Sequence, residues 1–498
     1  MNDDFYKYQL YYLQDLKTKL QENKITENEY TDKAAVSYIL EFGLKYFVQR
    51  FESWCQTYIV NVTDIFNCIY AYSKYENDIN NGYLIPDEDT IIGLHTLRYV
   101  LAISPSLSLS KQGDAIIKNN LIYSPNLFVL TKLLILLTQF RCIASLCNSP
   151  AISIDLSKSW VDIRYLDCSL EKKIHLSKTK GIQLLCPKLI DYSIPRHFSK
   201  LLLKVFGEPA SLFNDFISEP QGHLSYNNQV RPINLTKFIN RNIKSVFIKE
   251  LILTSESVNL LNVISKPHII DHRTRFKPIL KLNVDQEFLY VTSQWLVFET
   301  FSELSLNRLP FQGLPESWRK YSEIKDYANK IHLEVGQKFE QFIANQIDPS
   351  FEFYSNIKQV NNTSVETAPV IIDSKDTGRT VGEIDFLIIN PNKHILYVAD
   401  AKHLKSKYLI SSFYGDKSKF DNYVIKLLDK YNWVKGNIHL VNELFTEDIT
   451  TYSVQMCFIT QAYVFYALFV EYPIIPASCI NQYISTNNKF CYLHNEAN

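Results

Sequence analysis

The sequence predicts an α+β protein whose C-terminal third forms an α/β core with the element order αβββαβ. The chain has 498 residues, which is more than one hydrophobic core usually organises, and this favours two or three domains. Hydrophobic residues make up 46% and charged residues 21%, with only 13 Gly and 18 Pro, so compact structure is expected throughout. The hydrophobic pattern changes twice, which divides the chain into regions 1–150, 151–315 and 316–498.

The first region is expected to be helical, and the first 310 residues are expected to recognise a substrate, a partner protein or a second copy of the chain. Apolar residues recur there at helical spacing in three segments, 5–20, 33–53 and 88–104. The apolar segment 127–140 contains Lys132 and is shorter than the roughly 20 residues that cross a bilayer. We therefore expect a buried helix there and no membrane span.

The middle region is expected to mix helices and strands, because its apolar runs are short. Residues 276–301 contain two such runs, with a hairpin predicted near Asn283–Gln286. The polar stretch 271–276, DHRTRF, either contacts nucleic acid or forms an ordinary loop, and the loop is favoured. Two prolines and a glycine within 310–322 mark the boundary to the third region.

The third region alternates between helical and strand patterns. We expect a helix at 322–347, a strand at 352–358, a polar loop at 361–380, strands at 382–390 and 394–402, a helix at 416–437 and a strand at 452–460. The two central strands are apolar on both faces and are separated by the turn sequence NPNK. This pattern predicts an antiparallel hairpin in the middle of a sheet.

This hairpin carries acidic residues at positions where a strand is expected to be buried. Asp400 and Lys402 are two residues apart, about 7 Å along the chain, and should project from the same face. A hairpin closed at NPNK brings Asp385 close to Asp400. Two buried carboxylates repel each other unless a cation lies between them.

A divalent metal ion is the cation that this arrangement favours. Oxygen ligands without neighbouring zinc-type Cys or His clusters favour Mg²⁺ or Mn²⁺, and such ions commonly act on phosphate esters. A lysine beside the ion can orient the attacking water and stabilise charge on the phosphate. Glu383 shares the face of Asp385 and either assists the metal or is solvated, and the solvated state is favoured. His403 either contacts phosphate or has no role, and the second is favoured.

The helix at 322–347 is expected to supply a third acid. Its apolar stripe includes Phe339 and Ile343, and Glu340 lies at the edge of that stripe. Gly336 is expected to let the helix approach the sheet closely. Glu340 should therefore reach the acidic edge of the sheet.

The helix at 416–437 is expected to present a basic ridge to nucleic acid. Lys419, Lys426 and Lys430 should lie together on one flank, and Lys405 precedes them. Residues 402–435 contain eight Lys and three acidic residues, a net charge of +5. Such a ridge suits contacts with a phosphate backbone, without base recognition, although a solvated helix face remains the simpler interpretation.

The glutamate in GQKFE (336–340), followed by GEID (382–385) and DAK (400–402), resembles the PD-(D/E)XK, restriction-endonuclease-like nuclease superfamily. The resemblance covers about residues 320–470. It implies metal binding by Asp385, Asp400 and the carbonyl of Ala401, a catalytic Lys402 and an accessory acid at Glu340. Two features depart from the family pattern. Ile384 replaces the proline of the family name, and the Gln-Tyr pair that some branches carry on the later helix lacks its Gln.

The family resemblance implies a Mg²⁺- or Mn²⁺-dependent endonuclease that hydrolyses phosphodiester bonds in DNA, as in genome defence or restriction. The alternative is a catalytically silent nuclease-like protein that binds nucleic acid or serves assembly. Lys plus Arg and Asp plus Glu both total 52, so any basic surface must be local. The nine Cys include no C-x-x-C pair and the N-terminus is acidic, which predicts a cytoplasmic protein.

Overall fold

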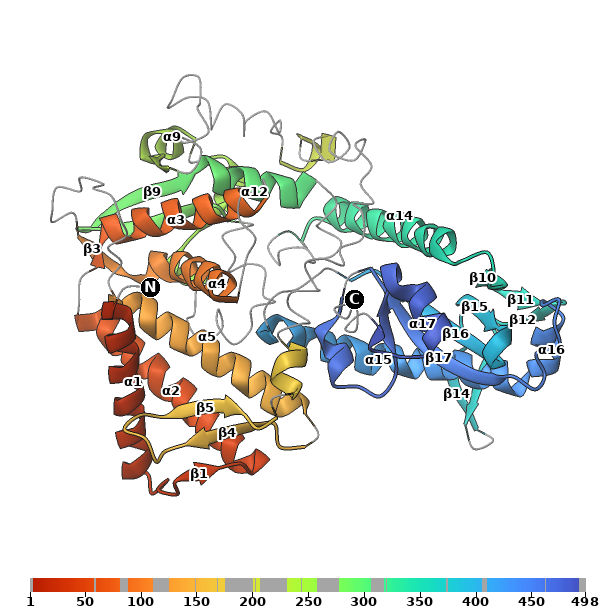
Figure 1. Ribbon diagram of the computed structural model, residues 1–498. Helices are drawn as coiled ribbons and strands as arrows, with labels where there is room; N and C mark the ends of the chain where they lie inside the picture. Colours follow the sequence, from red (N-terminus) through yellow and green to blue (C-terminus); the bar gives the residue numbers. More distant parts are fainter. Residues whose placement is uncertain are drawn as a thin grey trace. The chain divides into compact units, whose positions relative to one another are not determined.

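The computed structural model describes residues 3–491 except 58–59, 81–87, 111–124, 148, 168, 175–199, 202, 207–230, 243, 258–276, 306–317, 319, 373–374, 405–409 and 462. The chain forms two compact units (Figure 1). The first contains Met1–Cys168 and Ile190–Lys330, and the second contains Ser169–Leu189 and Ile331–Asn498. The stretch 271–276 lies outside the described residues.

The first unit begins with long helices, and all of them except the third, Val62–Asn80, overlap segments that the sequence predicted to be helical. The helices are α1 (Asp3–Glu22), α2 (Lys33–Thr57), α3 (Val62–Asn80), α4 (Glu88–Ile103) and α5 (Pro125–Leu146). Helices α1 and α2 both pack against α5. Within the described residues, only the stretch 126–146 of α5 is long and apolar enough to span a membrane, and 72% of its most apolar window is buried inside the protein. Core helices of globular proteins show the same burial.

A six-stranded sheet joins the first and middle regions of the sequence into this one unit. Its main path is β2-β3-β8-β9-β6, with β7 paired to β8. The expected division between 150 and 151 therefore does not separate two folded units. The predicted hairpin is confirmed: β8 and β9 pair antiparallel and close at Asp285 and Gln286, which both have positive φ. The strands are β2 (Val60–Asn61), β3 (Ser108–Ser110), β6 (Pro232–Asn234), β7 (Ile252–Leu253), β8 (Ile279–Val284) and β9 (Glu287–Ser293).

The remaining elements of the first unit are shorter. A three-stranded sheet has the order β1-β4-β5, and α12 follows directly after β9. The bounds are β1 (Glu29–Tyr30), β4 (Ile152–Asp155), β5 (Asp162–Tyr165), α9 (Thr236–Arg241), α10 (Val246–Glu250) and α12 (Gln294–Ser305).

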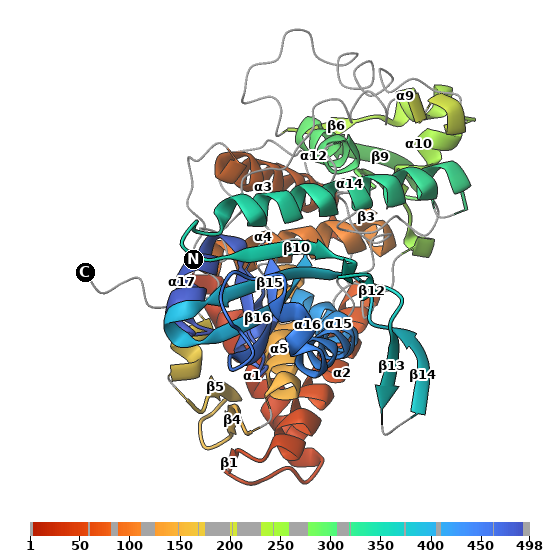
Figure 2. The ribbon, with the colours of Figure 1, turned by 90° about the vertical axis from the view of Figure 1, so that its right-hand side faces the viewer.

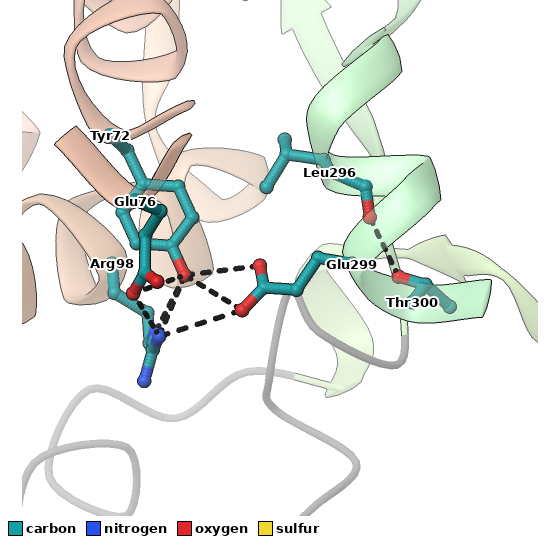
Figure 3. A network of polar contacts seen from close by, with 6 residues as sticks. All are labelled: Tyr72, Glu76, Arg98, Leu296, Glu299 and Thr300. Atoms are coloured by element: carbon teal, nitrogen blue, oxygen red, sulfur yellow. Dashed lines mark hydrogen bonds and ion pairs between the residues drawn. The ribbon is translucent and has the colours of Figure 1, made fainter. Parts of the chain in front are cut away.

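A buried polar network ties α3, α4 and α12 together (Figure 3). Arg98 on α4 contacts Glu76 at 3.0 Å and Glu299 at 3.8 Å. The Tyr72 hydroxyl accepts from Arg98 Nη2 at 2.7 Å and donates to Glu299 Oε2 at 3.1 Å. Because one guanidinium faces two carboxylates on different helices, the network fixes the packing of these helices.

The second unit is built around a five-stranded mixed sheet with the order β10-β15-β16-β17-β18. The first three strands pair antiparallel, whereas β16 pairs parallel with β17 and β17 with β18. The predicted strands lie where expected. Their bounds are β10 (Phe353–Ile357), β15 (Ile384–Asn390), β16 (Ile395–Lys402) and β17 (Ser453–Thr460), and β18 (Ile474–Pro476) was not predicted.

Helices flank this sheet, and α15 (Ile410–Gly436) packs against β16 and β17. Helix α14 (Ser322–Gln346) begins in the first unit and continues into the second. Gly336 on α14 does not mark a close approach, because a Cβ added there would meet no atom within 4 Å. The short helices α16 (Ile438–Asn442) and α17 (Ile480–Thr486) complete the unit.

The predicted polar loop at 361–380 is instead mostly β-structure. Strands β11 (Gln359–Val360) and β12 (Thr363–Ser364) form one hairpin, and β13 (Pro369–Ile372) and β14 (Lys375–Thr380) form another. Figure 2 shows the second hairpin standing apart from the five-stranded sheet. All six residues of β14 are exposed, which explains why no buried-strand pattern is visible in the sequence.

Candidate metal and catalytic site

Asp385 and Asp400 lie opposite each other on neighbouring strands. The antiparallel pairing ends at Phe386 and Ala399, and continuing the same register by one residue sets Asp385 against Asp400. Directly opposed residues share a face of the sheet, with Cβ atoms about 5 Å apart. Lys402 shares that face because it lies two residues after Asp400 on the same strand. The predicted arrangement of these three residues is confirmed.

Two lysines neutralise the two carboxylates. Lys402 Nζ lies 2.5 Å from Asp400 Oδ2 and donates to the carbonyl of Ala401 at 3.2 Å. Lys430, from α15, donates to Asp400 Oδ1 at 2.6 Å and to Asp385 Oδ1 at 3.1 Å. The second oxygen of Asp385 accepts from the amide of Ala401 at 2.8 Å. Each of the four carboxylate oxygens therefore has a donor in hydrogen-bonding range.

The two carboxylates differ in acidity because their surroundings differ. Burial, followed by the charge of Asp400, raises the pKa of Asp385 to about 7. Burial also opposes ionisation of Asp400, but Lys402 and Lys430 outweigh it and hold the pKa of Asp400 below its usual range. Burial would lower the pKa of Lys430, yet Asp400 and Asp385 raise it above its usual value. Lys430 is therefore a charged ammonium at neutral pH.

Glu340 joins a second acidic pair rather than contacting Asp400 directly. The other acid of this pair is Glu383. When the side-chain amide of Asn356 is oriented with its nitrogen towards both acids, that nitrogen donates to Glu340 Oε2 at 3.0 Å and to Glu383 Oε1 at 3.2 Å. Burial and the charge of Glu383 raise the pKa of Glu340. Glu383 is not simply solvated, because Lys358 also lies 3.5 Å from its carboxylate.

Asn356 was not predicted as a site residue. It lies between Ser355 and Ile357, which pair with Phe386 and Ile384 on either side of Asp385, and it has a φ of +56°. Asparagine tolerates this left-handed conformation better than most residues, which is compatible with a distortion of the strand at this point. An asparagine within a predicted strand was the only indication that the sequence offered.

Aromatic rings lie beside the lysine end of β16. Lys402 Nζ lies 5.1 Å from the centre of the Tyr423 ring, a distance suited to a cation–π contact. His403 packs against Phe339 with ring centres 5.5 Å apart. Burial lowers the pKa of His403 to about 3, so its imidazole is neutral and does not offer a positive charge to phosphate.

The predicted basic ridge on α15 is only partly seen. Lys419 and Lys426 are exposed. The expectation that Lys430 lies with them on an exposed flank is wrong, because 9% of its side chain is exposed and its ammonium faces the two carboxylates. Lys405 lies outside the described residues.

The position of Lys430 on the helix explains why it is buried. The sequence indicates this face, since Lys430 lies three residues after Leu427 and four before Val434, and both of these are fully buried. A lysine within such a stripe can project into the core towards the sheet.

The residues present fit a hard divalent cation better than zinc. Asp385 and Asp400 offer oxygens that already converge on one positive group, and the Ala401 carbonyl accepts from Lys402, which also contacts Asp400. Mg²⁺ often uses only one or two protein carboxylates, with water and substrate phosphate completing its shell. Among the residues that the structure describes, no cluster of three or more His, Cys, Asp or Glu side chains could hold a metal alone.

Comparisons of the chain with protein-family models, with curated proteins and with solved structures gave no match. The assignment of a function therefore depends on the geometry of this site and on the sequence motifs that form it.

Proposed function

We propose that the second unit is a metal-dependent phosphodiester hydrolase of the PD-(D/E)XK class. The observation that carries this proposal is the convergence of Asp385, Asp400 and Lys402 on one face of two paired strands, with a positive group between the carboxylates. The particular activity proposed is endonucleolytic cleavage of DNA. The sequence resemblance supports that activity, and restriction or genome defence is the corresponding role.

Asp385, Asp400 and the Ala401 carbonyl would hold Mg²⁺ or Mn²⁺. When bound, such an ion supplies Lewis-acid activation of water and neutralises charge on the phosphate. Asp400 would also position the catalytic lysine, because its Oδ2 lies 2.5 Å from Lys402 Nζ. The site thus keeps its lysine fixed rather than free to rotate, which is the preorganisation that electrostatic catalysis requires.

Lys402 is the proposed catalytic lysine. Its ammonium is anchored by Asp400 and by the Ala401 carbonyl, while the Tyr423 ring lies on another side. From this position Nζ can orient the attacking water and stabilise negative charge on a non-bridging phosphate oxygen. Glu340 is the proposed accessory acid, and Asn356 fixes its carboxylate.

The exposed lysines of α15 are the proposed contacts with the phosphate backbone. Lys419 and Lys426 lie on the helix that also carries Lys430, which links the outer surface of α15 to the site. Contacts of this kind position a nucleic acid without reading its sequence. The first unit is the proposed place for recognition of substrate or partner.

The test is cleavage of supercoiled plasmid DNA by the purified chain in Mg²⁺, compared with Asp400→Asn and Lys402→Ala. Each variant should lose activity by about a hundredfold or more, the usual loss when a charged group acting on the transition state is removed. Lys393→Ala is the matched control, because this exposed residue lies in the turn at the other end of β16. Full activity in either folded site variant would falsify the proposal.

One observation favours a catalytically silent protein as the second candidate. Lys402 and Lys430 already balance the negative charge of both carboxylates, so the two acids do not need a metal ion to offset their repulsion. A Mn²⁺ titration separates the two candidates. Binding that depends on Asp385 and Asp400 supports the nuclease, whereas a folded protein that binds no Mn²⁺ supports the silent alternative.

A further inference from the structure

Lys430 occupies the place between the carboxylates where a bridging cation would lie. Its ammonium is 2.6 Å from Asp400 Oδ1 and 3.1 Å from Asp385 Oδ1, so it contacts one oxygen of each acid. The exposed fraction of its side chain is 9%, against 2% for Asp400 and 15% for Asp385. This is a buried ion triad rather than a surface salt bridge.

The ammonium and a divalent ion cannot occupy this place together. Mg²⁺ binds carboxylate oxygens at about 2.0–2.1 Å. An ion between the two acids would need the same oxygens that now accept hydrogen bonds from Lys430. Two positive ions this close would also repel each other strongly in a buried site. Since Leu427 and Val434 on either side of Lys430 are fully buried, α15 holds the base of the side chain against the sheet.

Lys402 does not have the same relation to the acids. It contacts the other oxygen of Asp400, Oδ2, and the Ala401 carbonyl. The two lysines thus contact different carboxylate oxygens. Lys402 holds one outer oxygen of Asp400, and Lys430 bridges Asp400 and Asp385.

From this geometry, and on the basis of the proposed metal function, we propose that Lys430 is the internal counter-ion of the metal site. Its ammonium holds Asp385 and Asp400 together in the metal-free protein, and a divalent ion binds by exchange for that ammonium. Lys430 is therefore a positioning residue whose charge weakens the affinity for metal. The exchange also explains how two buried carboxylates remain side by side before metal arrives.

The test measures Mn²⁺ binding at pH 8 by the full chain, following free Mn²⁺ by electron paramagnetic resonance. Lys430→Met removes the competing charge and keeps most of the side-chain volume, so Mn²⁺ should bind about tenfold more tightly or better, equivalent to at least about 1.4 kcal/mol. Lys430→Gln keeps a hydrogen-bond donor without the charge and should also bind more tightly. Lys430→Arg keeps the charge and should show no gain.

Lys435→Met is the matched control for long-range electrostatics. It removes one positive charge from the same helix, but Lys435 is exposed and lies in the last turn. The affinity of this variant for Mn²⁺ should stay within about twofold of the wild type, because solvent and salt screen an exposed charge much more than a buried one. Circular dichroism checks that each variant is folded, and Lys430→Gln decides the matter if Lys430→Met does not fold.

The outcomes separate this inference from the proposed function. Tighter binding by both neutral variants supports the exchange, and unchanged or weaker binding by the folded neutral variants overturns it. Asp400→Asn should abolish binding in either background. If the wild type binds Mn²⁺ through Asp400 and the neutral variants show no gain, only the counter-ion role falls. If neither the wild type nor the neutral variants bind, the metal site and this inference both fall.

Discussion

At the scale of single residues, the ammonium of Lys402 is held on three sides. Asp400 Oδ2 and the Ala401 carbonyl are its oxygen partners, and the Tyr423 ring lies 5.1 Å away. The ring itself is fixed, since it packs against Phe420 with centres 5.7 Å apart. Tyr423 therefore restricts where Lys402 can point.

Replacing the ring should misplace the lysine without removing it. We expect Tyr423→Leu to lower the rate of Mg²⁺-dependent cleavage by about twofold to thirtyfold, since a cation–π contact contributes about 0.5–2 kcal/mol. Tyr423→Phe keeps the ring and should retain most of the activity. Single-turnover cleavage rates make the comparison, and an equal loss in both variants would assign the effect to the hydroxyl.

The sequence predicts much of the site at this scale, but not its counter-ion. The positions of Asp385, Asp400 and Lys402 follow from two apolar strands and one turn, because strand parity and hairpin closure are local rules. The burial of Lys430 depends on which face of α15 meets the sheet. Helical spacing places Lys430 beside the exposed Lys426 but also beside the buried Leu427 and Val434, and the packing of α15 on the sheet decides between these two faces.

At the scale of elements, α15 presents two faces with different partners. Its inner face carries Lys430 and contacts β16 and β17, while Lys419 and Lys426 are exposed. The exposed lysines are those able to meet a phosphate backbone. Ile425 and Leu428 are also 43% and 38% exposed, so the outer face is not wholly polar.

The double variant Lys419→Ala, Lys426→Ala should weaken DNA binding and make it less sensitive to salt. Each phosphate contact adds about one to the slope of log affinity against log salt, so the slope should fall by about two. Fluorescence anisotropy over a range of NaCl concentrations gives this slope. Lys393→Ala should leave it unchanged, and an unaltered slope in the double variant would place the DNA elsewhere.

Helices α3, α4 and α12 depend on the network of Figure 3 for their packing. Arg98→Met should lower the free energy of unfolding of the first unit by about 3 kcal/mol, because two poorly exposed carboxylates lose the guanidinium that both contact. Tyr72→Phe should cost only about 1 kcal/mol, the usual contribution of one hydroxyl hydrogen bond. Urea denaturation followed by circular dichroism measures both, and equal losses would contradict a central role for Arg98.

Sequence patterns predict buried elements better than exposed ones. Strands β15 and β16 are recognisable because nearly every residue in them is apolar and buried. The hairpin β11–β12 is short, although its Asn361-Asn362 turn, with φ of +42° and +64°, is typical of a two-residue hairpin. The exposed hairpin β13–β14 has no buried face, so no periodicity marks it.

At the scale of the whole molecule, the two units are not consecutive along the chain. The segment Ser169–Leu189 belongs to the second unit although the first unit continues after it. Within its described part, Ile174 is buried and Lys173 Nζ lies 5.7 Å from the centre of the Phe490 ring. The predicted boundary near residue 315 misses the segment Ser169–Leu189. Contacts between residues distant in sequence assign this segment to the second unit, and local sequence patterns do not reveal such contacts.

Ile174→Ala tests this assignment. It should lower the stability of the second unit by about 2–5 kcal/mol, the usual cost of truncating a buried isoleucine. Hydrogen exchange of backbone amides should become faster in β16 and stay unchanged in α5 of the first unit. Glu171→Ala, at an exposed position in the same segment, should have little effect. Faster exchange confined to α5 would assign the segment to the first unit.

The excursion has a consequence for how the protein is made. At about 5–20 residues per second, a ribosome takes roughly 15 to 60 s to go from Ile174 to Phe490. During that interval the segment Ser169–Leu189 has been synthesised, whereas most of the second unit has not. A nascent chain interrupted before the last strands therefore contains this early segment but lacks most of the unit against which that segment packs.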